Sequence, residues 1–504
     1  MRRRQDASIT AGQSAATGGA RPVRAAALSG ESVGGLLLGL FVAALVLPVF
    51  FHLGDLRLSP VRVLLLATIV PLALRLLQGQ AGPLRAADAF IGLHCLWIAA
   101  AIVMVEGAAR IPFAGITAVE LGGGYLVGRV LVRSRADFRL LLMAFLGSLA
   151  FLLPFAVLEF LTDRQLLQDA AGLVASTFEK PESSRPRLGF HRTMAGFEHP
   201  ILFGLYCSVA VAHLLYLWQW SPVRRLVLVA MVTALTFLSL SAAPLLAVAF
   251  QVGLWAWDRL SGGRWGLLGL LVVLGYVTVD LLSNRTPLTV LISYLTFSEE
   301  TGYTRILIWE YGKAAALANP LFGIGLGDWP RPFWLTESVD NFWLLTAMRY
   351  GLPALAFLLA GIVAGAWAIL RARGLDEEVA SYRSGYLVSL GAILLTLGTV
   401  HIWGAVSVFV MMWLGAGLWF ADARPEARPE TRQETAPQTV PQAAGRTPYT
   451  RQAEALRRGG RPAPAKPAAP PAPDDDSGKS PPASRKRAPA ALRRAPQPEP
   501  GPRR

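Results

Sequence analysis

The chain has 504 residues, 53% of them apolar and only 16% charged, and because soluble proteins carry roughly a quarter charged residues, this composition excludes an ordinary water-soluble enzyme. The net charge of +15 lies mostly in the two flanking segments, where it is typical of membrane topology and of contact with anionic lipid, so no nucleic-acid partner is expected. The two cysteines, Cys95 and Cys207, are too few for a disulfide framework or a cysteine-based metal site.

Apolar stretches long enough to cross a hydrocarbon core recur along the chain and predict an all-α, polytopic membrane helix bundle of about twelve transmembrane helices. Residues 1–34 are expected to form a disordered, basic cytoplasmic segment, followed by a transmembrane domain over 35–421. Residues 422–504 are rich in Pro, Ala and Arg, and they are expected to form a disordered cytoplasmic tail because they have few bulky side chains to bury. The expected helices are 35–53, 61–78, 88–105, 112–132, 138–161, 200–219, 225–241, 243–257, 265–283, 341–370, 384–401 and 403–421.

The arginines of the short loops predict the orientation of these helices. With the N-terminus inside, the short cytoplasmic loops hold several times as many arginines as the short outer loops. Both termini are then cytoplasmic, in a bacterial inner membrane, and two longer segments, 162–199 and 284–340, lie on the outer, periplasmic side. Within the second of these, 298–318 is expected to be a helix outside the bilayer that ends before Pro320.

The strongest local pattern lies in this second outer segment. Arg305, Trp309 and Gly312 have the spacing of one helix face. An arginine beside an aromatic ring at a membrane surface is suited to phosphate binding, because the planar guanidinium can donate to two oxygens at once. The alternative is an interfacial helix, in which Trp309 anchors the helix and Arg305 extends toward lipid headgroups.

The order of motifs from Arg305 onward resembles the core of the bacterial O-antigen ligase and O-antigen polymerase superfamily. The resemblance covers Thr304–Ala354: Arg-x-x-x-Trp from Arg305, Asn-Pro-Leu-x-Gly-x-Gly from Asn319, and Asn341 followed ten positions on by Gly351. It implies a glycosyltransferase without metal or cofactor, acting at the outer face of the inner membrane. The implied donor is an undecaprenyl-pyrophosphate-linked oligosaccharide, and the implied acceptor is a sugar hydroxyl of a lipid A core or of a growing glycan.

The resemblance also implies roles for single residues. Arg305 and Arg192, the latter in a weaker match over Arg192–Gly204, would neutralise the pyrophosphate as charge builds on the bridging oxygen. Two positions depart from the family pattern: Asp340 stands where the family has His, and Ala242 stands where ligases often carry Arg. A carboxylate can still accept a proton from an attacking hydroxyl. The departures favour an O-antigen or exopolysaccharide polymerase over a ligase.

The first outer segment adds basic and titratable side chains. They are interpreted as a second wall of the pyrophosphate site or, alternatively, as a juxtamembrane cluster that meets lipid phosphates. If Asp340 is not the base, His191 or His199 is the next candidate, because the ordinary pKa of histidine lies near neutrality. These two histidines without a third ligand do not predict a zinc site. The expected catalytic residues are Asp340, Arg305 and Arg192, and the expected substrate contacts are Trp309, Asn341, Arg187, His191 and His199.

Two residues inside or beside the predicted helices leave other functional classes open. Glu120 lies near the middle of the predicted helix 112–132, where an acid is either functional or paired, for instance with Arg129. It is the main feature in favour of a secondary transporter. Transporters usually concentrate ionisable residues at the midplane, whereas the polar residues of this chain lie mostly in the outer loops. His401, beside Trp403, is expected to be an interfacial anchor. A third class is a membrane-anchored interaction protein, which would leave the motifs after Arg305 without a function.

Overall fold

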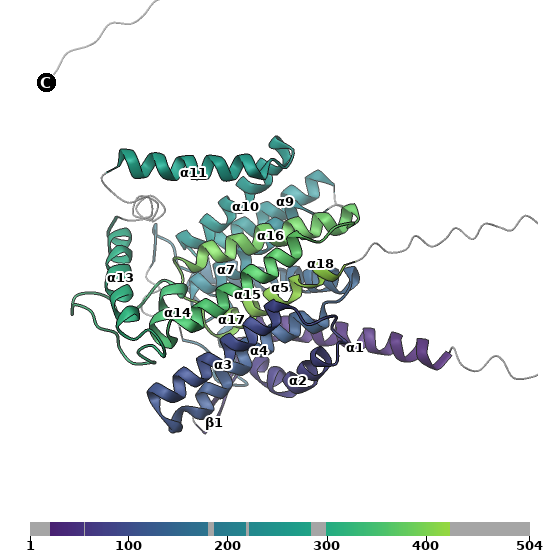
Figure 1. Ribbon diagram of the computed structural model, residues 1–504, viewed down its shortest axis with the longest axis horizontal. Coiled ribbons are helices and arrows are strands. Elements are labelled where there is room, and N and C mark those ends of the chain that lie inside the picture. Colours follow the sequence, from purple (N-terminus) through teal and green to yellow (C-terminus); the bar gives the residue numbers. More distant parts are fainter. Residues whose placement is uncertain (1–20, 55, 180–185, 218–220, 284–298, 424–504) are drawn as a thin grey trace, which may run out of the picture. The chain divides into compact units, whose positions relative to one another are not determined.

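The computed structural model describes residues 21–54, 56–179, 186–217, 221–283 and 299–423. These residues are helical, apart from loops and one short antiparallel hairpin formed by β1 (Phe51–Leu53) and β2 (Leu56–Leu58) (Figure 1). Seven of the described helices, some of them extended by an adjoining short turn, are long and apolar enough to cross a membrane. The chain is therefore a multi-pass helical membrane protein. Most of the predicted tail, 422–504, and the first twenty residues lie outside the described residues.

The helices follow one another with short connections except at two places, the segment before α7 and the segment around α13. Their bounds are α1 (Arg21–Val46), α2 (Pro60–Leu77), α3 (Ala86–Glu106), the 3₁₀ turn η1 (Ala108–Arg110), α4 (Ile111–Leu131), α5 (Arg135–Thr162), α6 (Leu166–Gly172), α7 (Pro200–Ser208), α8 (Ala210–Leu215), α9 (Pro222–Phe237), α10 (Ala242–Ser261), α11 (Trp265–Leu282), α13 (Glu299–Ala318), α14 (Phe342–Tyr350), α15 (Leu352–Leu370), α16 (Glu377–Leu397), α17 (Gly404–Gly417) and α18 (Trp419–Asp422).

Several helix boundaries differ from those expected. Helix α1 begins at Arg21, so the described part of the segment expected to be disordered is helical, and it ends at Val46 rather than at residue 53. Pro48 explains this end, because a proline disfavours helical backbone at the residue before it. The expected helix 341–370 is broken at Gly351 into α14 and α15. The expected boundary near residue 241 does separate two helices, α9 and α10, with Leu240 in the left-handed region at φ +44°.

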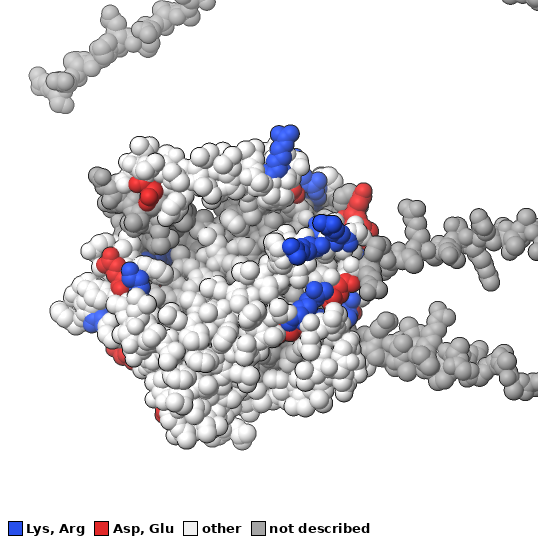
Figure 2. Space-filling model, in the orientation of Figure 1, with Lys and Arg blue, Asp and Glu red and all other residues white. Residues whose placement is uncertain are grey.

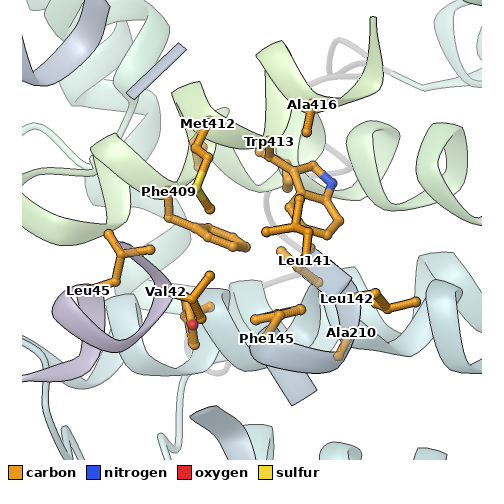
Figure 3. Packing of buried hydrophobic residues seen from close by; sticks show 14 of the residues in the cluster. Val42, Leu45, Leu141, Leu142, Phe145, Ala210, Phe409, Met412, Trp413 and Ala416 are labelled. Atoms are coloured by element: carbon orange, nitrogen blue, oxygen red, sulfur yellow. The ribbon is translucent and has the colours of Figure 1, made fainter. Parts of the chain in front are cut away.

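Helix α17 lies at the centre of the core and packs directly against α4. A Cβ on Gly128 would lie 1.9 Å from the carbonyl oxygen of Met412, and a Cβ on Gly415 would lie 2.1 Å from that of Tyr125. The two backbones can touch only because these positions lack side chains, as is common where helices associate in membranes. On its other side α17 meets α1, α5 and α8 through fully buried apolar side chains, among them Phe145 and Trp413 (Figure 3).

Charged side chains link the segment between α2 and α3, together with the start of α3, to the ends of α4 and α18. Arg129 at the end of α4 is fully buried and donates to Asp88 at 3.0 Å and to the carbonyl oxygen of Ala81 at 2.7 Å. Arg85 forms an ion pair with Asp422. Figure 2 shows Lys and Arg side chains gathered on the right of the visible face, whereas most of that face is uncharged. Arg85 and Arg129 belong to the loops predicted to be cytoplasmic.

Candidate functional site

A cavity of about 1410 Å³ lies among the segments that the sequence places outside the membrane. Its wall is built from four parts of the chain: the segment before α7, the α9–α10 turn, α13 with the loop that leads to α14, and the α16–α17 turn. These parts are far apart in the sequence. The titratable and charged side chains that line the cavity are Arg187, Arg192, His199, Arg305, Asp328, Glu337, Asp340, Arg349 and His401.

Arg192 is held in the cavity wall by the α9–α10 turn. Its side chain is buried, and it donates from Nε to the carbonyl oxygen of Ser239 at 3.2 Å and from Nη2 to Oγ of Ser241 at 2.9 Å. Burial, followed by the neighbouring Arg187, lowers the pKa of Arg192 to about 10. The side chain therefore remains cationic at neutral pH, with its orientation set by the protein before any ligand arrives.

The backbone around Arg192 is fixed by a buried carboxylate of α5. Glu159 accepts hydrogen bonds from the backbone N–H of Met194 at 3.1 Å and of Ala195 at 2.9 Å. The N–H of Thr193 donates to the carbonyl oxygen of Leu238 at 3.1 Å. The segment before α7 is thus attached both to α5 and to the end of α9, which explains how a loop residue can hold a definite position.

Two further arginines meet Arg192 in the cavity. Arg187 lies at the exposed rim and donates to the carbonyl oxygen of Leu240 at 3.0 Å. Burial lowers the pKa of Arg305. Arg187 lowers it further, whereas Asp340 acts in the opposite direction. Nε of Arg305 is buried and has no hydrogen-bond partner among the described residues. The three guanidinium groups and one carboxylate are thus close enough to influence one another, and their net charge favours an anion.

Asp340 lies in the cavity, but its neighbour in the sequence does not. The carboxylate of Asp340 accepts a hydrogen bond from Oγ of Ser338 at 2.9 Å. The side chain of Asn341 accepts from the N–H of Leu344 at 3.0 Å and so begins α14 as its N-cap. Asn341 has this structural role and is not among the residues that line the cavity.

Trp309 does not share the cavity with Arg305. Helix α13 turns Arg305, Ile308 and Gly312 toward the protein, and a Cβ on Gly312 would lie 2.7 Å from Cδ2 of Leu344. Trp309 follows Ile308 by one residue, which rotates it by about 100° around the helix axis, and it is 38% exposed. The expected common face of Arg305 and Trp309 is therefore divided between the cavity and the surface.

The three histidines of this region have different environments. Nδ1 of His191 lies 3.3 Å from Asp163, with both side chains at least 40% exposed, and His191 does not line the cavity. His199 does line it, and its Nδ1 accepts from the N–H of Ile201 at 3.1 Å as the N-cap of α7. Burial lowers the pKa of His199 to about 4, with smaller contributions from two nearby arginines.

His401, expected to be an interfacial anchor, lines the same cavity. Its ring lies between Phe342 and Trp403, with centroids at 6.4 and 5.5 Å and interplanar angles of 15° and 27°. Burial lowers the pKa of His401 to about 4, and Arg349 acts in the same direction. Sequence reasoning did not assign four of the charged or titratable cavity residues to the site: Asp328, Glu337, Arg349 and His401. The position of His401 at the outer end of the predicted helix 384–401 was the available signal.

The Asn-Pro-Leu-x-Gly-x-Gly segment from Asn319 forms part of the cavity wall, and it packs against the break between α14 and α15. Gly323 has φ +71°, and a Cβ there would lie 2.4 Å from the carbonyl oxygen of Met348. Gly351 has φ +84°, and its Cβ would lie 1.8 Å from the carbonyl oxygen of Leu321. The N–H of Leu352 donates to Pro320 at 2.8 Å. The two halves of the sequence pattern are therefore each other's packing partners.

A second, mainly apolar cavity of about 320 Å³ adjoins the first among α3, α4, α14, α15, α16 and α17. Both cavities are lined by Leu345, Arg349, His401 and Trp403. At the rim of the second cavity, Arg57 donates to Glu198 at 2.9 Å and Arg62 to Glu120 at 2.7 Å.

The partner of Glu120 is thus Arg62 at the start of α2. Arg129, which the sequence suggested, is paired with Asp88 instead. The acid in the middle of α4 is therefore accounted for by an ion pair at the edge of the second cavity. This pairing is the structural outcome that the sequence left open.

The chemistry that this arrangement offers is the binding of an anion beside a neutral histidine and a carboxylate. Among the described residues, no group of three or more His, Cys, Asp or Glu side chains could hold a metal ion. No protein-family model matches the chain, and no curated protein is detectably similar to it.

Proposed function

We propose that this protein is a membrane glycosyltransferase of the O-antigen ligase and polymerase type. It transfers an undecaprenyl-pyrophosphate-linked glycan to a sugar hydroxyl at the periplasmic face of a bacterial inner membrane, for the biosynthesis of O-antigen or exopolysaccharide. The observation that carries the proposal is the convergence of Arg187, Arg192 and Arg305 on one cavity. The order of the motifs from Arg305 to Gly351, which resembles this superfamily, supports it independently.

The three guanidinium groups suit the charge changes of such a reaction. When the bond between the anomeric carbon and the phosphate oxygen breaks, its electron pair stays on the pyrophosphate, and negative charge develops there. Arg192 is already oriented by Ser239 and Ser241, so little reorganisation is needed at that moment. The unpartnered Nε of Arg305 offers a further donor. Burial lowers the pKa of Arg305, and Asp340 opposes this lowering, so it acts as an electrostatic partner of the arginines.

The finer topology belongs to the same proposal. In it, twelve helical passes place both termini in the cytoplasm, and the cavity opens on the opposite side of the membrane. The support is that the cavity-lining segments are those that the arginine counts assign to the outside. A polymerase is favoured over a ligase because Ala242, at the position where ligases often carry Arg, is itself part of the cavity wall.

The test compares Arg305→Ala with Lys313→Ala, which removes an exposed cation two turns further along α13. In a deletion strain, Arg305→Ala is expected to abolish long surface polysaccharide at unchanged protein level, whereas Lys313→Ala restores it. In purified full-length protein, Arg305→Ala is expected to weaken the binding of farnesyl diphosphate about tenfold or more, since hydrogen bonds to charged groups contribute about 1.5–3 kcal/mol.

Normal polysaccharide with Arg305→Ala would contradict the proposal and favour a transporter. If the deletion strain instead loses the attachment of glycan to lipid A while the glycan chains still grow, the protein is a ligase. Accumulation of single repeat units in the deletion strain is the result expected of a polymerase.

A further inference from the structure

His401 occupies the boundary between the two cavities. It lies in the turn between α16 and α17, and its ring is held between Phe342 and Trp403. Among the described residues, it is the only titratable side chain besides Arg349 that lines both cavities. His401 therefore forms part of the wall that the two cavities share.

One ring nitrogen of His401 makes no hydrogen bond to the described protein. Its Nδ1 is buried and has no partner among the described residues, and an unpaired buried polar atom costs about 1–3 kcal/mol. The other two histidines of the region differ, since Nδ1 of His199 accepts from the α7 backbone and Nδ1 of His191 faces Asp163. An unsatisfied nitrogen beside an anion-binding cavity indicates that a ligand completes the site.

We infer that His401 is the general base that takes the proton from the attacking sugar hydroxyl, a role that the sequence assigned to Asp340. The inference rests on the proposed function. The acceptor oxygen forms a bond to the anomeric carbon of the donor, and its proton passes to His401. The bond from that carbon to the pyrophosphate breaks, and the electron pair leaves with the pyrophosphate, which the arginines bind. The proton on the imidazolium is then released to water.

The charges around the ring connect this role to donor binding. Without ligand, burial and Arg349 keep His401 neutral, with a pKa of about 4. A bound pyrophosphate adds negative charge among the arginines and raises the pKa of His401 toward neutrality, which makes it a stronger base when the donor is present. The charged and titratable groups that line the two cavities with it are Arg349, Arg187, Arg192, His199, Arg305, Asp328, Glu337 and Asp340, and Arg57, Arg62, His94, Glu120, Glu198 and Tyr350.

A direct test observes the ring by NMR in the full-length protein, in nanodiscs, with ¹³C-labelled histidine. The chain has only six histidines, and His401→Gln or His401→Asn assigns the resonance. Between pH 5.5 and 8 the free protein is expected to show a neutral His401. Saturating farnesyl diphosphate is expected to raise its pKa by about two pH units or more, which brings its titration into this range. A diphosphate that binds without moving the pKa of His401 would overturn the inference.

The catalytic test uses membranes of the host strain, which contain the native donor. His401→Gln is expected to slow glycan transfer about a hundredfold or more, while the affinity for farnesyl diphosphate stays within about twofold of wild type. His52→Gln, at an exposed position that lines neither cavity, is expected to change neither quantity.

The outcomes separate the two proposals. If wild-type protein does not bind farnesyl diphosphate, the proposed function fails, and this inference fails with it. If the diphosphate binds and Asp340→Asn abolishes transfer while His401→Gln does not, the proposed function stands and His401 is not the base. If His401→Gln weakens binding as strongly as transfer, its role is in ligand binding, and the inference is again wrong.

Discussion

Arg192 and Arg305 lie in the same cavity, but the protein holds them differently. Arg192 donates to Ser239 and Ser241 of the α9–α10 turn, so its charge also connects two parts of the fold. Arg305 has a buried Nε without a partner among the described residues. A buried hydrogen bond to a charged group stabilises the fold, whereas an unsatisfied donor does not.

Substitution of these two arginines should therefore affect stability differently. Arg192→Ala is expected to reduce the free energy of unfolding by about 1–3 kcal/mol, because Ser241 and the Ser239 carbonyl lose their charged donor. Arg305→Ala is expected to change it by less than about 0.5 kcal/mol. Thermal unfolding of both variants in the same detergent measures the difference. Equal destabilisation would show that Arg305 also has a structural role.

The ion pair between Arg62 and Glu120 is a second place where the pairing of a charged side chain should affect stability. Glu120 lies within a membrane-spanning helix with 12% of its side chain exposed, and Arg62 is its hydrogen-bonded partner. Arg62→Met should cost about 3 kcal/mol, since removal of one partner leaves a buried carboxylate unpaired. The double variant with Glu120→Gln should recover most of that loss. A double-mutant cycle on thermal unfolding checks this, and full additivity would exclude the coupling.

At the scale of elements, the break between α14 and α15 determines the wall of the large cavity. Gly351 lies between the two helices with φ +84°, and the loop after α13 docks there through backbone hydrogen bonds from Ile324 and Leu352. An ordinary side chain at Gly351 would meet the Leu321 carbonyl. The glycines of this region thus allow the cavity loop to approach the helices at backbone distance.

Alanine substitutions can show which of these glycines is needed for close packing. Gly351→Ala is expected to lower the free energy of unfolding by about 2 kcal/mol or more, from left-handed backbone strain and the clash with Leu321. Gly327→Ala is the matched control in the same motif, because nothing lies within 4 Å of its added Cβ. Thermal unfolding with proteolysis of the loop measures both. An equal or larger loss for Gly327→Ala would show that the close contact at Gly351 does not account for the effect.

At the scale of the whole molecule, charge is distributed in two different ways. In the connections predicted to be cytoplasmic, charges are paired closely, as in Arg129 with Asp88 and Arg85 with Asp422. In the large cavity, arginines gather with fewer carboxylates and an unpartnered donor. The first arrangement stabilises the fold, and the second suits an anionic ligand.

Cysteine labelling can test the orientation of these two regions. The native cysteines give little background, since Cys95 is 6% exposed and Cys207 fully buried. Phe333→Cys replaces a side chain that is 99% exposed in the cavity loop, and an impermeant maleimide should label it in intact spheroplasts. Arg373→Cys, also at an exposed position, should react only after lysis. The reverse pattern would place the cavity in the cytoplasm and exclude a periplasmic donor.

The helical membrane architecture follows from the sequence, and the structure confirms it. Long apolar runs such as 61–78 and 138–161 match α2 and α5 to within a few residues, because a backbone in lipid must satisfy its hydrogen bonds within each segment. The break at Gly351 was not predicted. It depends on contact with the carbonyl of Leu321, in a loop distant in the sequence from the apolar run, and local hydropathy does not contain that contact.

The sequence by itself determined which residue types could bind a phosphate or accept a proton. Arg192 and Arg305 carry the first chemistry and Asp340 the second, and all three lie in segments too polar for the bilayer. Only the tertiary structure decided which of their neighbours join them. It brings His401 and Arg349 to the cavity and turns Trp309 away from it. The physical reason is that a site between helices depends on rotation and contact across the bundle, and neither is encoded in the local spacing of residues.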